Sequence, residues 1–391
     1  MKIGVLITYF YPFRDGTENQ ALYWSKELAK RHEVHIFTSD RRNGTVLKNK
    51  YKLHGGMQIH RYKTIFRYKY YLCWNWKLIF DLLRADLDIL HIHSIGFPQQ
   101  DLAVMLLKLL KPKLKIVNFP HGPFLANENY GWQVKIFREF YRAIERTIIN
   151  GKYDGIIDCN GFQKNTWMKK YFPKLEKVFY CPDGIPRDRF QKIESEDFAK
   201  KLGLKNKFII AHMGRLLKYK GQEQVLKVLP HIIKKHPNTI YLIIGEDRGY
   251  KKELCELVKQ LGLEKNVVFA GWVSEDDKLR ALDVADVICF TSMPGTEAFG
   301  ITLLEGMARG CVPITTKIGE SSPAVQHGEN GFIYDYNDLA SLEKYLLRLI
   351  EDDTLYKKMQ LMSLEKVQNF VNEDIVWKYL EPKYLELTGL K

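Results

Sequence analysis

The sequence contains few cysteines and no long apolar run. Its six cysteines include no C-x-x-C pair, and their spacing suggests no disulfide framework; they are Cys73, Cys159, Cys181, Cys255, Cys289 and Cys311. A reducing, cytoplasmic setting is therefore expected. No stretch of 18 apolar residues occurs, and the longest candidate, residues 102–110, is short and interrupted by Lys108. A membrane-spanning helix is not expected.

The N-terminus lacks the small-residue cleavage site of a secretory signal peptide. Residues 1–13, MKIGVLITYFYPF, contain one lysine and an apolar run that ends in proline and phenylalanine. This pattern favours a first buried strand that leads into a loop. No internal repeat and no low-complexity segment stands out, so an ordinary globular protein is expected.

Acidic residues are scarce in the first half of the chain. Residues 1–190 contain 32 Lys and Arg against 17 Asp and Glu, a net charge of +15, whereas residues 191–391 contain 28 against 29, a net charge of −1. This excess fits a solubilising surface, an acidic substrate or an anionic membrane surface. No nucleic-acid-binding motif accompanies the positive charge, so no nucleic acid partner is expected.

Short apolar runs alternate with amphipathic stretches along the whole chain. The apolar runs predict strands at 2–8, 33–39, 57–62, 87–94, 115–122, 153–160, 177–184, 207–215, 239–245, 266–271, 286–292, 311–317 and 330–336. The amphipathic stretches predict helices, for example at 19–31, 222–236, 251–262 and 274–285. Apolar strands that alternate with helices favour parallel sheets covered on both faces. Because 391 residues exceed one ordinary core, we expect an α/β protein with two doubly wound, Rossmann-like domains.

A polar stretch at residues 184–206 separates two such series of strands. We therefore expect domains at 1–190 and 191–370, with residues 371–391 forming a C-terminal helix that packs back on the first domain. Ligands of open parallel sheets bind at the carboxyl ends of the strands. The cleft between the two domains, lined by loops that follow strands, is the expected site.

Histidines near strand ends in the first half allow two interpretations. His121, in NFPHGPF, follows a strand and lies in a turn between Pro120 and Gly122, where a hydrogen-bonded turn histidine and a site residue are both possible. His91 and His93 alternate on one strand, but no third metal ligand follows at useful spacing, which favours a structural role. Asp86 and Asp88 resemble a D-x-D metal motif, yet they precede their strand, so no metal is expected there.

The loop GRLLKYKG, residues 214–221, contains two cations at the end of a strand. Arg215 and Lys220 are five residues apart, and Gly214 and Gly221 adjoin them. Arginine can grip a phosphate with two hydrogen bonds, lysine acts as a point charge, and a helix N-terminus follows. This pattern favours a diphosphate site over a solvated basic loop, whereas Lys218 is expected to be solvated.

The stretch PGTEAFGITLLEGMARG, residues 294–310, carries two glutamates eight positions apart. Gly300 is a poor residue for a helix interior, so a helix is predicted from Gly300 to Arg309 with Gly310 after its end. Glu297 then lies in the loop and Glu305 on the helix, and both can reach one cleft. The amides of 300–303 are expected to be free for a phosphate. Glu305 could instead be a surface residue, although its apolar neighbours make that reading less attractive.

The first loop, FYPFRDGTE at residues 10–18, gives a weaker signal. Gly16 permits a tight backbone, and Thr17 is a plausible cap for the helix that begins near residues 17–19. The helix N-terminus could face an anion.

Five segments together resemble the retaining GT-B glycosyltransferases of family 4, over nearly the whole chain. FYPFRDGTE resembles the family's F-x-P-x-x-G-G-x-E, PHG its strand-end His-Gly, and CPDGIPRDRF its P-N-G-V-D-x-x-x-F. GRLLKYKG resembles its G-R-L-x-x-x-K-G, and TEAFGITLLEGMARGCVPI its E-x₇-E signature. The resemblance implies a hexosyltransferase that uses a nucleotide-sugar as substrate and needs no cofactor or metal.

The resemblance also implies roles for particular residues. Arg215 and Lys220 would neutralise the donor diphosphate, and Glu305 would accept hydrogen bonds from the ribose. Glu297 and the backbone at Phe299 and Gly300 would hold the donor sugar. The remaining implied site residues are His121 near the reaction centre, Gly16 and Gly214 in the phosphate loops, Trp272 near the base, and Ile301 and Thr302 at the helix start.

Three positions depart from the family pattern. Thr17 replaces the second glycine of the first loop, and Asp183 replaces the asparagine of the interdomain motif. Where the family commonly has a glutamate five residues before Gly328, this chain has Pro323, and Glu320 lies three residues earlier. The role of that carboxylate in relatives cannot be transferred here.

The acceptor is less well defined than the donor. Residues 59–77 interleave basic groups with aromatic side chains, namely Tyr62, Phe66, Tyr68, Tyr70, Tyr71, Trp74 and Trp76. Such a segment suits either an anionic membrane surface or lipid head group, or a half-buried loop or helix over the first sheet. We expect transfer with retention from a UDP- or GDP-sugar to a glycan or lipid-linked acceptor, at the cytoplasmic face of the membrane. A nucleotide-sugar epimerase, a sugar phosphorylase and a non-catalytic nucleotide-sugar-binding subunit remain alternatives.

Overall fold

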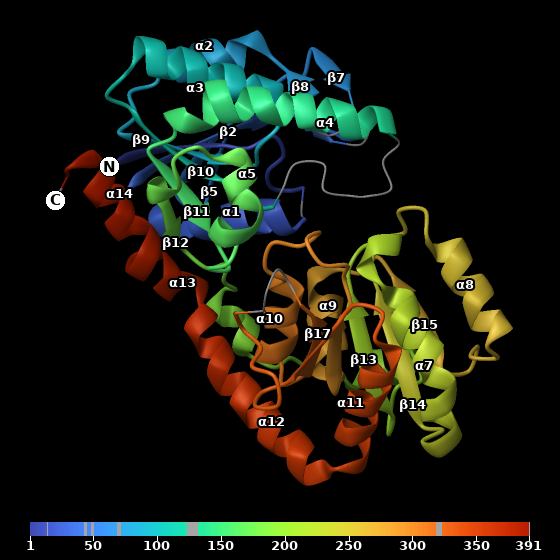
Figure 1. Ribbon diagram of the computed structural model, residues 1–391. Helices are drawn as coiled ribbons and strands as arrows, with labels where there is room; N and C mark the ends of the chain where they lie inside the picture. Colours follow the sequence, from blue (N-terminus) through green and yellow to red (C-terminus); the bar gives the residue numbers. More distant parts are fainter. Residues whose placement is uncertain are drawn as a thin grey trace. The chain divides into compact units, whose positions relative to one another are not determined.

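A computed structural model describes residues 1–13, 15–42, 45–47, 51–68, 72–122, 132–317 and 323–390. The chain divides into two compact units, which are described separately (Figure 1). Unit 1 comprises Met1–Asp183 together with Asn372–Lys391, and unit 2 comprises Gly184–Val371. The division falls seven residues before the boundary expected at residue 190.

Unit 1 is built around an eight-stranded sheet in the order β12-β11-β10-β9-β1-β2-β6-β5. All neighbouring strands are parallel except β5, which pairs antiparallel with β6 at the edge. The strands are β1 (Lys2–Leu6), β2 (Glu33–Ser39), β5 (Tyr51–His54), β6 (Met57–Tyr62), β9 (Ile89–His93), β10 (Lys115–Phe119), β11 (Gly155–Asp158) and β12 (Val178–Tyr180). Two short hairpins, β3 (Arg41–Arg42) with β4 (Thr45–Val46) and β7 (Phe66–Tyr68) with β8 (Leu72–Trp74), were not predicted.

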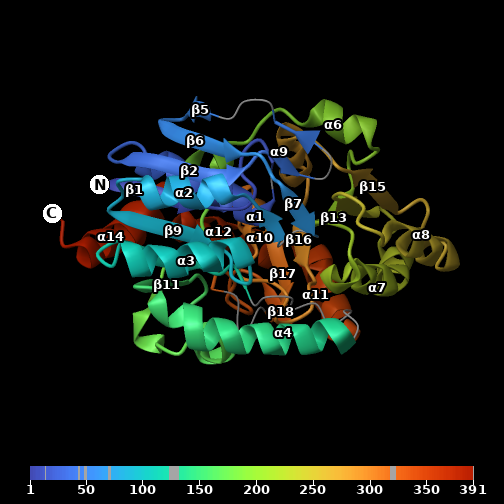
Figure 2. The same ribbon diagram turned by 90° about the horizontal axis from the view of Figure 1, so that it is seen from above.

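Helices cover both faces of this sheet (Figures 1 and 2). One face carries α2 (Trp76–Arg84), α3 (Pro98–Leu110) and α4 (Trp132–Ile144), and the other carries α1 (Gly16–Leu28), α13 (Asn372–Ile375) and α14 (Glu381–Thr388). A three-residue helix, α5 (Lys169–Tyr171), precedes β12. The arrangement confirms the predicted doubly wound fold.

The C-terminal segment packs on unit 1, as predicted. The Trp377 indole donates to Glu27 on α1 at 2.7 Å, and the Tyr384 hydroxyl lies 2.6 Å from Nδ1 of His91 on β9. Glu381 contacts His32 at 2.8 Å. The last 20 residues are therefore part of the first domain's structure.

Unit 2 contains a parallel six-stranded sheet in the order β15-β14-β13-β16-β17-β18. Its strands are β13 (Phe208–Met213), β14 (Thr239–Ile244), β15 (Val267–Gly271), β16 (Val287–Phe290), β17 (Val312–Thr316) and β18 (Phe332–Tyr334). Its helices are α6 (Glu196–Lys201), α7 (Gln222–Lys235), α8 (Lys251–Gln260), α9 (Glu275–Asp283), α10 (Ile301–Ala308), α11 (Leu339–Glu351) and α12 (Asp353–Val367).

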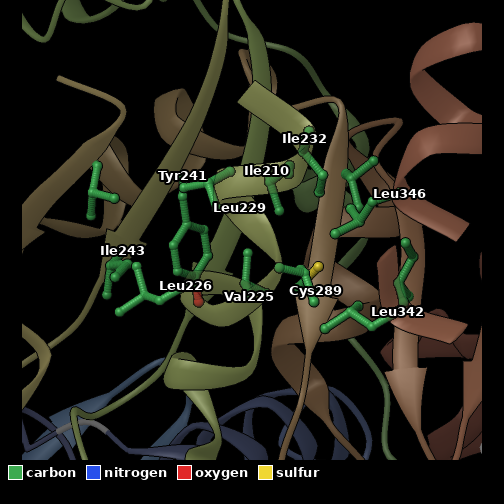
Figure 3. Close-up of a cluster of buried hydrophobic side chains, with 14 of the residues drawn as sticks. Ile210, Val225, Leu226, Leu229, Ile232, Tyr241, Ile243, Cys289, Leu342 and Leu346 are labelled. Atoms are coloured by element: carbon green, nitrogen blue, oxygen red, sulfur yellow. The ribbon is translucent and has the colours of Figure 1, made fainter. Parts of the chain in front are cut away.

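The core of unit 2 forms because apolar sheet residues meet apolar helix faces. Ile210, Tyr241 and Ile243 of the sheet pack against Val225 and Leu229 of α7, and α11 adds Leu342 and Leu346 (Figure 3). All of these side chains are buried. This packing fixes the strands whose carboxyl ends carry the candidate site.

The chain reverses its direction of strand addition once in each sheet. In unit 1 the reversal lies between β1 and β9, and in unit 2 it lies between β13 and β16. Loops diverge at such a point and leave a crevice outside the carboxyl ends of the two strands. Each unit therefore has one place where its topology favours a ligand.

Candidate functional site

The loop after β13 places the two predicted cations of unit 2 at its reversal point. A short 3-10 turn, Lys218–Lys220, ends at Gly221, which has a φ of +70°. A Cβ atom at Gly221 would lie 2.2 Å from the Thr291 carbonyl oxygen, so the loop approaches the end of β16 more closely than a side chain permits. This approach holds Lys220 beside the loop that follows β16, whereas Lys218 is exposed as predicted.

Lys220 and Glu297 form an ion pair in that crevice. Lys220 Nζ lies 2.6 Å from Glu297 Oε1, with side chains 12% and 18% exposed. The Ser292 hydroxyl donates to the same carboxylate oxygen at 3.3 Å, and Arg215 reaches the Tyr219 hydroxyl at 3.4 Å. The structure thus brings Lys220 and Glu297 together. Ser292 also contacts Glu297, although no sequence motif predicted it as a site residue.

Glu305 lies on the second turn of α10 and is buried. Its carboxylate accepts from Lys278 Nζ at 2.7 Å, and the same ammonium lies 3.0 Å from Glu275. Glu305 is 2% exposed, so the alternative that it is a surface residue is wrong. Lys278 was missed because its sequence context on α9 shows only a Glu275–Lys278 pair three residues apart, and its second partner is 27 residues away.

The start of α10 differs in detail from the prediction. Gly300 has a φ of +99° and is the N-cap, so the helix begins at Ile301 rather than at Gly300 and ends at Ala308. The Leu303 amide donates to Gly300 O at 2.9 Å, so the expectation that it is free is wrong. The amides of Ile301 and Thr302 precede the first hydrogen bond of the helix and point from its positive end.

Three further predicted site residues lie in loops that follow strands of unit 2. The Phe299 ring is 2% exposed and packs against Phe370 at 5.5 Å between centroids, which leaves only its backbone for a ligand. Trp272 follows β15 directly after Gly271 and is 78% exposed. Gly214 has the aliphatic end of Lys220 3.8 Å from where its Cβ would lie, so the lysine side chain covers it.

His121 lies at the end of β10 in unit 1 within a short chain of histidines. Its Nε2 is 2.8 Å from Nδ1 of His93, its ring stacks on Phe119 at 3.7 Å, and His93 stacks on His91 at 4.3 Å. Burial lowers the pKa of His121 to about 3, and it lowers that of His93 well below the usual value. His121 is therefore a neutral hydrogen-bonding group at physiological pH.

Other motif residues in unit 1 have partners within the protein. The Nδ1 atom of His91 lies against the Tyr384 hydroxyl, and Asp88 accepts from the Lys2 amide at 2.7 Å. Among the residues that the structure describes, no group of three or more His, Cys, Asp and Glu side chains could hold a metal ion. Glu320 lies outside the described residues, whereas Pro323 lies within them.

The helix that follows the first loop begins earlier than predicted. The N-cap of α1 is Asp15 and the helix starts at Gly16, so the prediction that Thr17 caps it is wrong. Arg42 pairs with the carboxylates of Asp15 and Glu18, which gives this helix start fixed ionic partners. A Cβ atom at Gly16 would meet nothing within 4 Å, so packing within the chain does not account for the glycine.

Residues 59–77 divide into a buried and an exposed part. Residues 59–62 belong to β6, a strand of the sheet itself, where Arg61 and Tyr62 are buried. They form neither an exposed lipid-binding surface nor the loop or helix expected over the sheet. Farther along, Ile65, Phe66 and Trp76 are 67%, 55% and 51% exposed. Tyr70 and Tyr71 lie outside the described residues. Within the described ranges, no helix is both long and apolar enough to cross a bilayer.

Comparison with known families accounts for both parts of the chain. Residues 194–362 match the family model described as glycosyl transferases group 1, and residues 14–189 match the model described as glycosyltransferase family 4. N-acetyl-alpha-D-glucosaminyl L-malate synthase of Bacillus anthracis is 26% identical and aligns over 97% of this chain and 96% of its own. Phosphatidyl-myo-inositol mannosyltransferase of Mycolicibacterium smegmatis is 24% identical over 95% and 90%.

Solved structures show the same fold. The structure of HepE from Anabaena in complex with UDP has a TM-score of 0.76 over 100% of both chains, at 18% identity. The complex of the same protein with UDP-glucose has a TM-score of 0.74 over 100% of this chain and 99% of that one, also at 18% identity. Two family models that together span most of the chain, and relatives that align over nearly all of it, agree with the five motifs. The chain therefore belongs to the group 1 glycosyltransferases of family 4, with the GT-B fold.

Proposed function

We propose that this glycosyltransferase moves a hexose or N-acetylhexosamine, with retention of configuration, from a UDP- or GDP-sugar to a glycan or lipid-linked acceptor. The observation that carries the donor assignment is the Lys220–Glu297 ion pair beside Arg215, at the reversal point of the unit 2 sheet. A nucleoside diphosphate needs cations, and its sugar and ribose need acceptors for their hydroxyl groups. Both kinds of group occur together in this crevice.

The charges in the crevice suit a departing diphosphate. Arg215, Lys220 and the amides of Ile301 and Thr302 are fixed positive groups that can stabilise the developing negative charge. These groups can take the place of a divalent cation, so we propose that transfer proceeds without metal. Equal rates with EDTA and with added Mg²⁺ are expected.

The two glutamates have different surroundings, which supports different roles. Glu297 is partly exposed and can exchange its contact with Lys220 for a hydroxyl of the donor sugar. Glu305 is buried and held by Lys278, so one side of its carboxylate is fixed and the other can accept from the ribose. We assign Glu297 to the sugar and Glu305 to the nucleoside.

The anomeric configuration is retained if the acceptor attacks the anomeric carbon on the same face from which the leaving group departs. The acceptor oxygen forms a bond to the anomeric carbon, the bond from that carbon to the diphosphate oxygen breaks, and the acceptor proton passes to the departing oxygen. We propose that neutral His121 acts as a hydrogen-bond partner of a substrate hydroxyl and adds no charge of its own. No carboxylate nucleophile is needed in this scheme.

Exposed apolar side chains support a membrane location at the cytoplasmic face. Among the described residues, every large exposed hydrophobic side chain except Trp272 and Leu361 belongs to unit 1. The same part of the chain contains the excess of positive charge. Anionic lipid headgroups and acyl chains together match a surface that is both basic and apolar.

Helix α4 shows this combination most clearly. Trp132, Ile136 and Phe140 recur every four residues and are 69%, 61% and 66% exposed, while Lys135 and Arg142 flank them. Replacing Ile136 and Phe140 by glutamate should abolish cosedimentation with anionic vesicles at low salt. Leu361→Glu in unit 2, at a side chain 67% exposed, is the matched control. Wild-type protein that stays in solution would disprove the membrane location.

A thermal-shift screen over UDP- and GDP-sugars tests the donor assignment. Stabilisation by one nucleotide-sugar class, lost in Lys220→Met and kept in Lys218→Met, is the expected result. The absence of stabilisation by every donor would overturn it. The HepE structures contain UDP and UDP-glucose, but their identity to this chain is 18%, so the screen includes both nucleotides.

Turnover assays separate the remaining alternatives. Transfer that requires an added glycan or lipid acceptor supports the transferase. An epimerase would convert the donor alone, a phosphorylase would require inorganic phosphate, and a binding subunit would take up donor with no turnover.

A further inference from the structure

The end of strand β9 places a second histidine, His93, beside His121. His93 is the last residue of β9 and pairs in register with Phe119, the last residue of β10. His121 follows two residues after Phe119 and is partly exposed, whereas His93 is 1% exposed. His93 is therefore too buried to contact a substrate, and any part that it has in the reaction must act through a neighbouring residue.

A hydrogen bond connects the two histidine rings. Nδ1 of His93 lies 2.8 Å from Nε2 of His121, and no other hydrogen bond of the His121 ring occurs among the residues that the structure describes. Nδ1 of His121 is therefore the ring nitrogen that a ligand hydroxyl can use. Both rings are neutral at physiological pH because burial lowers their pKa values. A neutral imidazole carries its proton on one nitrogen only, so the bond to His93 decides whether Nδ1 of His121 donates or accepts.

The ring of His93 is itself held in place by other aromatic rings. It stacks on His91 with centroids 4.3 Å apart and on His121 with centroids 5.1 Å apart. His91 is bonded in turn to the C-terminal helix α14, since its Nδ1 lies 2.6 Å from the Tyr384 hydroxyl. A ring packed in this way keeps one orientation and presents a fixed hydrogen-bonding group to His121.

The backbone at both strand ends has an uncommon conformation. Ser94, directly after His93, has a φ of +82°, and His121 has a φ of +55°, values that are uncommon outside glycine. The Ser94 amide donates to Phe119 O at 2.8 Å, and the Asn118 side-chain amide donates to Ser94 O at 2.9 Å. Such conformations persist where surrounding contacts enforce them, and they concentrate at functional sites. The strand ends are thus fastened to each other at the place where the two histidines meet.

We propose that His93 is a positioning residue for transfer, which orients the His121 ring and fixes its tautomer, so that Nδ1 meets a substrate hydroxyl in a single hydrogen-bonding state. The inference rests on the proposed role of His121 and adds to it a residue that touches no substrate. Without His93, the His121 ring exchanges between two tautomers. Part of the enzyme then presents the wrong group to the hydroxyl, which lowers kcat and leaves donor binding unchanged.

A double-mutant cycle with His121 tests the proposal. His93→Leu removes the hydrogen bond and should lower kcat about 3- to 10-fold, with KM for the donor unchanged. In a His121→Asn background the same substitution should have no further effect, because asparagine is too short to reach the position of Nε2 and His93 has nothing left to orient.

Two amide substitutions of His93 provide a matched comparison. His93→Asn should recover most of the lost kcat, because its amide group is as many bonds from Cα as Nδ1 of histidine. His93→Gln carries the same amide one bond farther out and should recover less. Both introduce a polar side chain at a buried position, so the comparison still decides where His93→Leu fails to fold. Melting temperatures of all variants identify such a failure.

NMR of protein labelled with ¹⁵N at histidine measures the tautomer without any turnover. The His121 ring, assigned from the signals lost in His121→Asn, should show a single tautomer in the wild type and averaged nitrogen shifts in His93→Leu. Tyr384→Phe is the matched control, because it removes a hydrogen bond from the same stack of rings but none from His121. Its His121 tautomer and its kcat should stay as in the wild type.

The outcomes separate the positioning role from the proposed function. Additive losses of kcat in the double variant, or a His121 tautomer that His93→Leu does not change, would overturn the positioning role alone. A His121→Asn enzyme with wild-type kcat would refute the role of His121 and the positioning role with it. Wild-type protein that transfers no sugar would refute the proposed function, and the tautomer measurement would still decide on His93.

Discussion

The two units have the same kind of sheet but different chemistry at the carboxyl edge. In unit 2 the reversal point between β13 and β16 holds ion pairs, Lys220 with Glu297 and, deeper, Lys278 with Glu305. In unit 1 the described residues that line the pocket at the ends of β1, β2 and β6 include no charged side chain, and burial keeps His121, at the end of β10, neutral. A shared topology thus fixes where a ligand can bind, and the loop residues decide which ligand it is.

The outer surfaces of the units differ as well. Unit 1 exposes large apolar side chains on α2, α3 and α4, whereas Trp272 and Leu361 are the examples in the described part of unit 2. The net charge of +15 in residues 1–190 against −1 in residues 191–391 follows the same division. Donor chemistry needs charge at one internal crevice, whereas a membrane-linked acceptor needs an interface spread over a surface.

Removing a cation from unit 2 should give the largest effect on activity. Lys220→Met takes away a positive charge at the proposed diphosphate site and leaves Glu297 without its cation. We expect transfer to fall about 10²- to 10³-fold, the usual loss for one fixed group that stabilises developing charge. Steady-state kinetics with the best donor measures it, and Lys218→Met, on the same turn but exposed, should stay near wild type. If the Lys220→Met enzyme transferred sugar at the wild-type rate, charge at the carboxyl edge of the unit 2 sheet would not distinguish it functionally from the edge of the unit 1 sheet.

Replacing each of the two glutamates by alanine should separate nucleotide binding from sugar transfer. Glu305→Ala removes the proposed ribose acceptor and should weaken nucleotide affinity about 10- to 100-fold, as expected for a hydrogen bond to a charged group. Glu297→Ala should bind nucleotide with nearly unchanged affinity and lose transfer. Titration calorimetry with the nucleoside diphosphate and an activity assay measure the two effects. Equal behaviour of the variants in both measurements would contradict the division.

Replacing Lys278 tests whether the buried carboxylate of Glu305 requires its cationic partner for stability. Lys278→Met leaves the Glu305 carboxylate, 3% exposed, without its cation, and should destabilise the protein by about 3 kcal/mol. Adding Glu305→Gln should restore much of that stability, because a neutral amide replaces the stranded charge. Urea unfolding of the single and double variants provides the comparison. Additive losses would indicate that the pair is not coupled.

Local patterns were sufficient to predict the elements and the loops of the donor crevice. Apolar runs predicted the 13 strands of the two parallel series, and glycine positions located the turns before and after α10. These signals are local, because strand burial and helix ends depend on neighbouring residues. The edge strand β5 and the hairpins β3–β4 and β7–β8 were missed because their residues include no continuous apolar run of the kind that marks the parallel strands.

Contacts between distant segments could not be predicted in the same way. The sequence places Lys278 on a helix, but its pairing with Glu305 depends on how α9 and α10 pack. Thr64 and Gln100 are 36 residues apart and line one pocket because β6 ends and α3 begins at the same edge of the sheet. The Thr17 cap was wrong because Asp15 precedes the helix and is held by Arg42, a residue 27 positions away.

His121 should increase kcat without contributing to the pH dependence of kcat. Its φ of +55° suits asparagine, which tolerates the left-handed region and keeps a hydrogen-bonding side chain. His121→Asn should lower kcat about 10-fold, with the ratio to wild type constant between pH 5.5 and 8.5, because a pKa of about 3 keeps the wild-type ring neutral throughout. A wild-type limb near pH 6.5 that disappears in the variant would show that the ring titrates.

Replacing buried carboxyl groups should have the smallest effect of these substitutions. The pH dependence of thermal stability should then differ clearly between the two units. Burial raises the pKa of Glu145 in unit 1 to about 9, whereas the pKa of Asp286 in unit 2 is raised only to about 6. The folded state keeps the Glu145 proton that the unfolded chain releases near pH 4, so its contribution to stability falls as pH rises from 4 to 9. Glu145→Gln, which preserves the bond from the Gly96 amide, should therefore gain on the order of 2–5 °C in Tm over wild type between pH 5 and 8. The corresponding gain for Asp286→Asn should increase with pH only up to about pH 6 and stay level above it. Parallel curves for the two variants would contradict the difference.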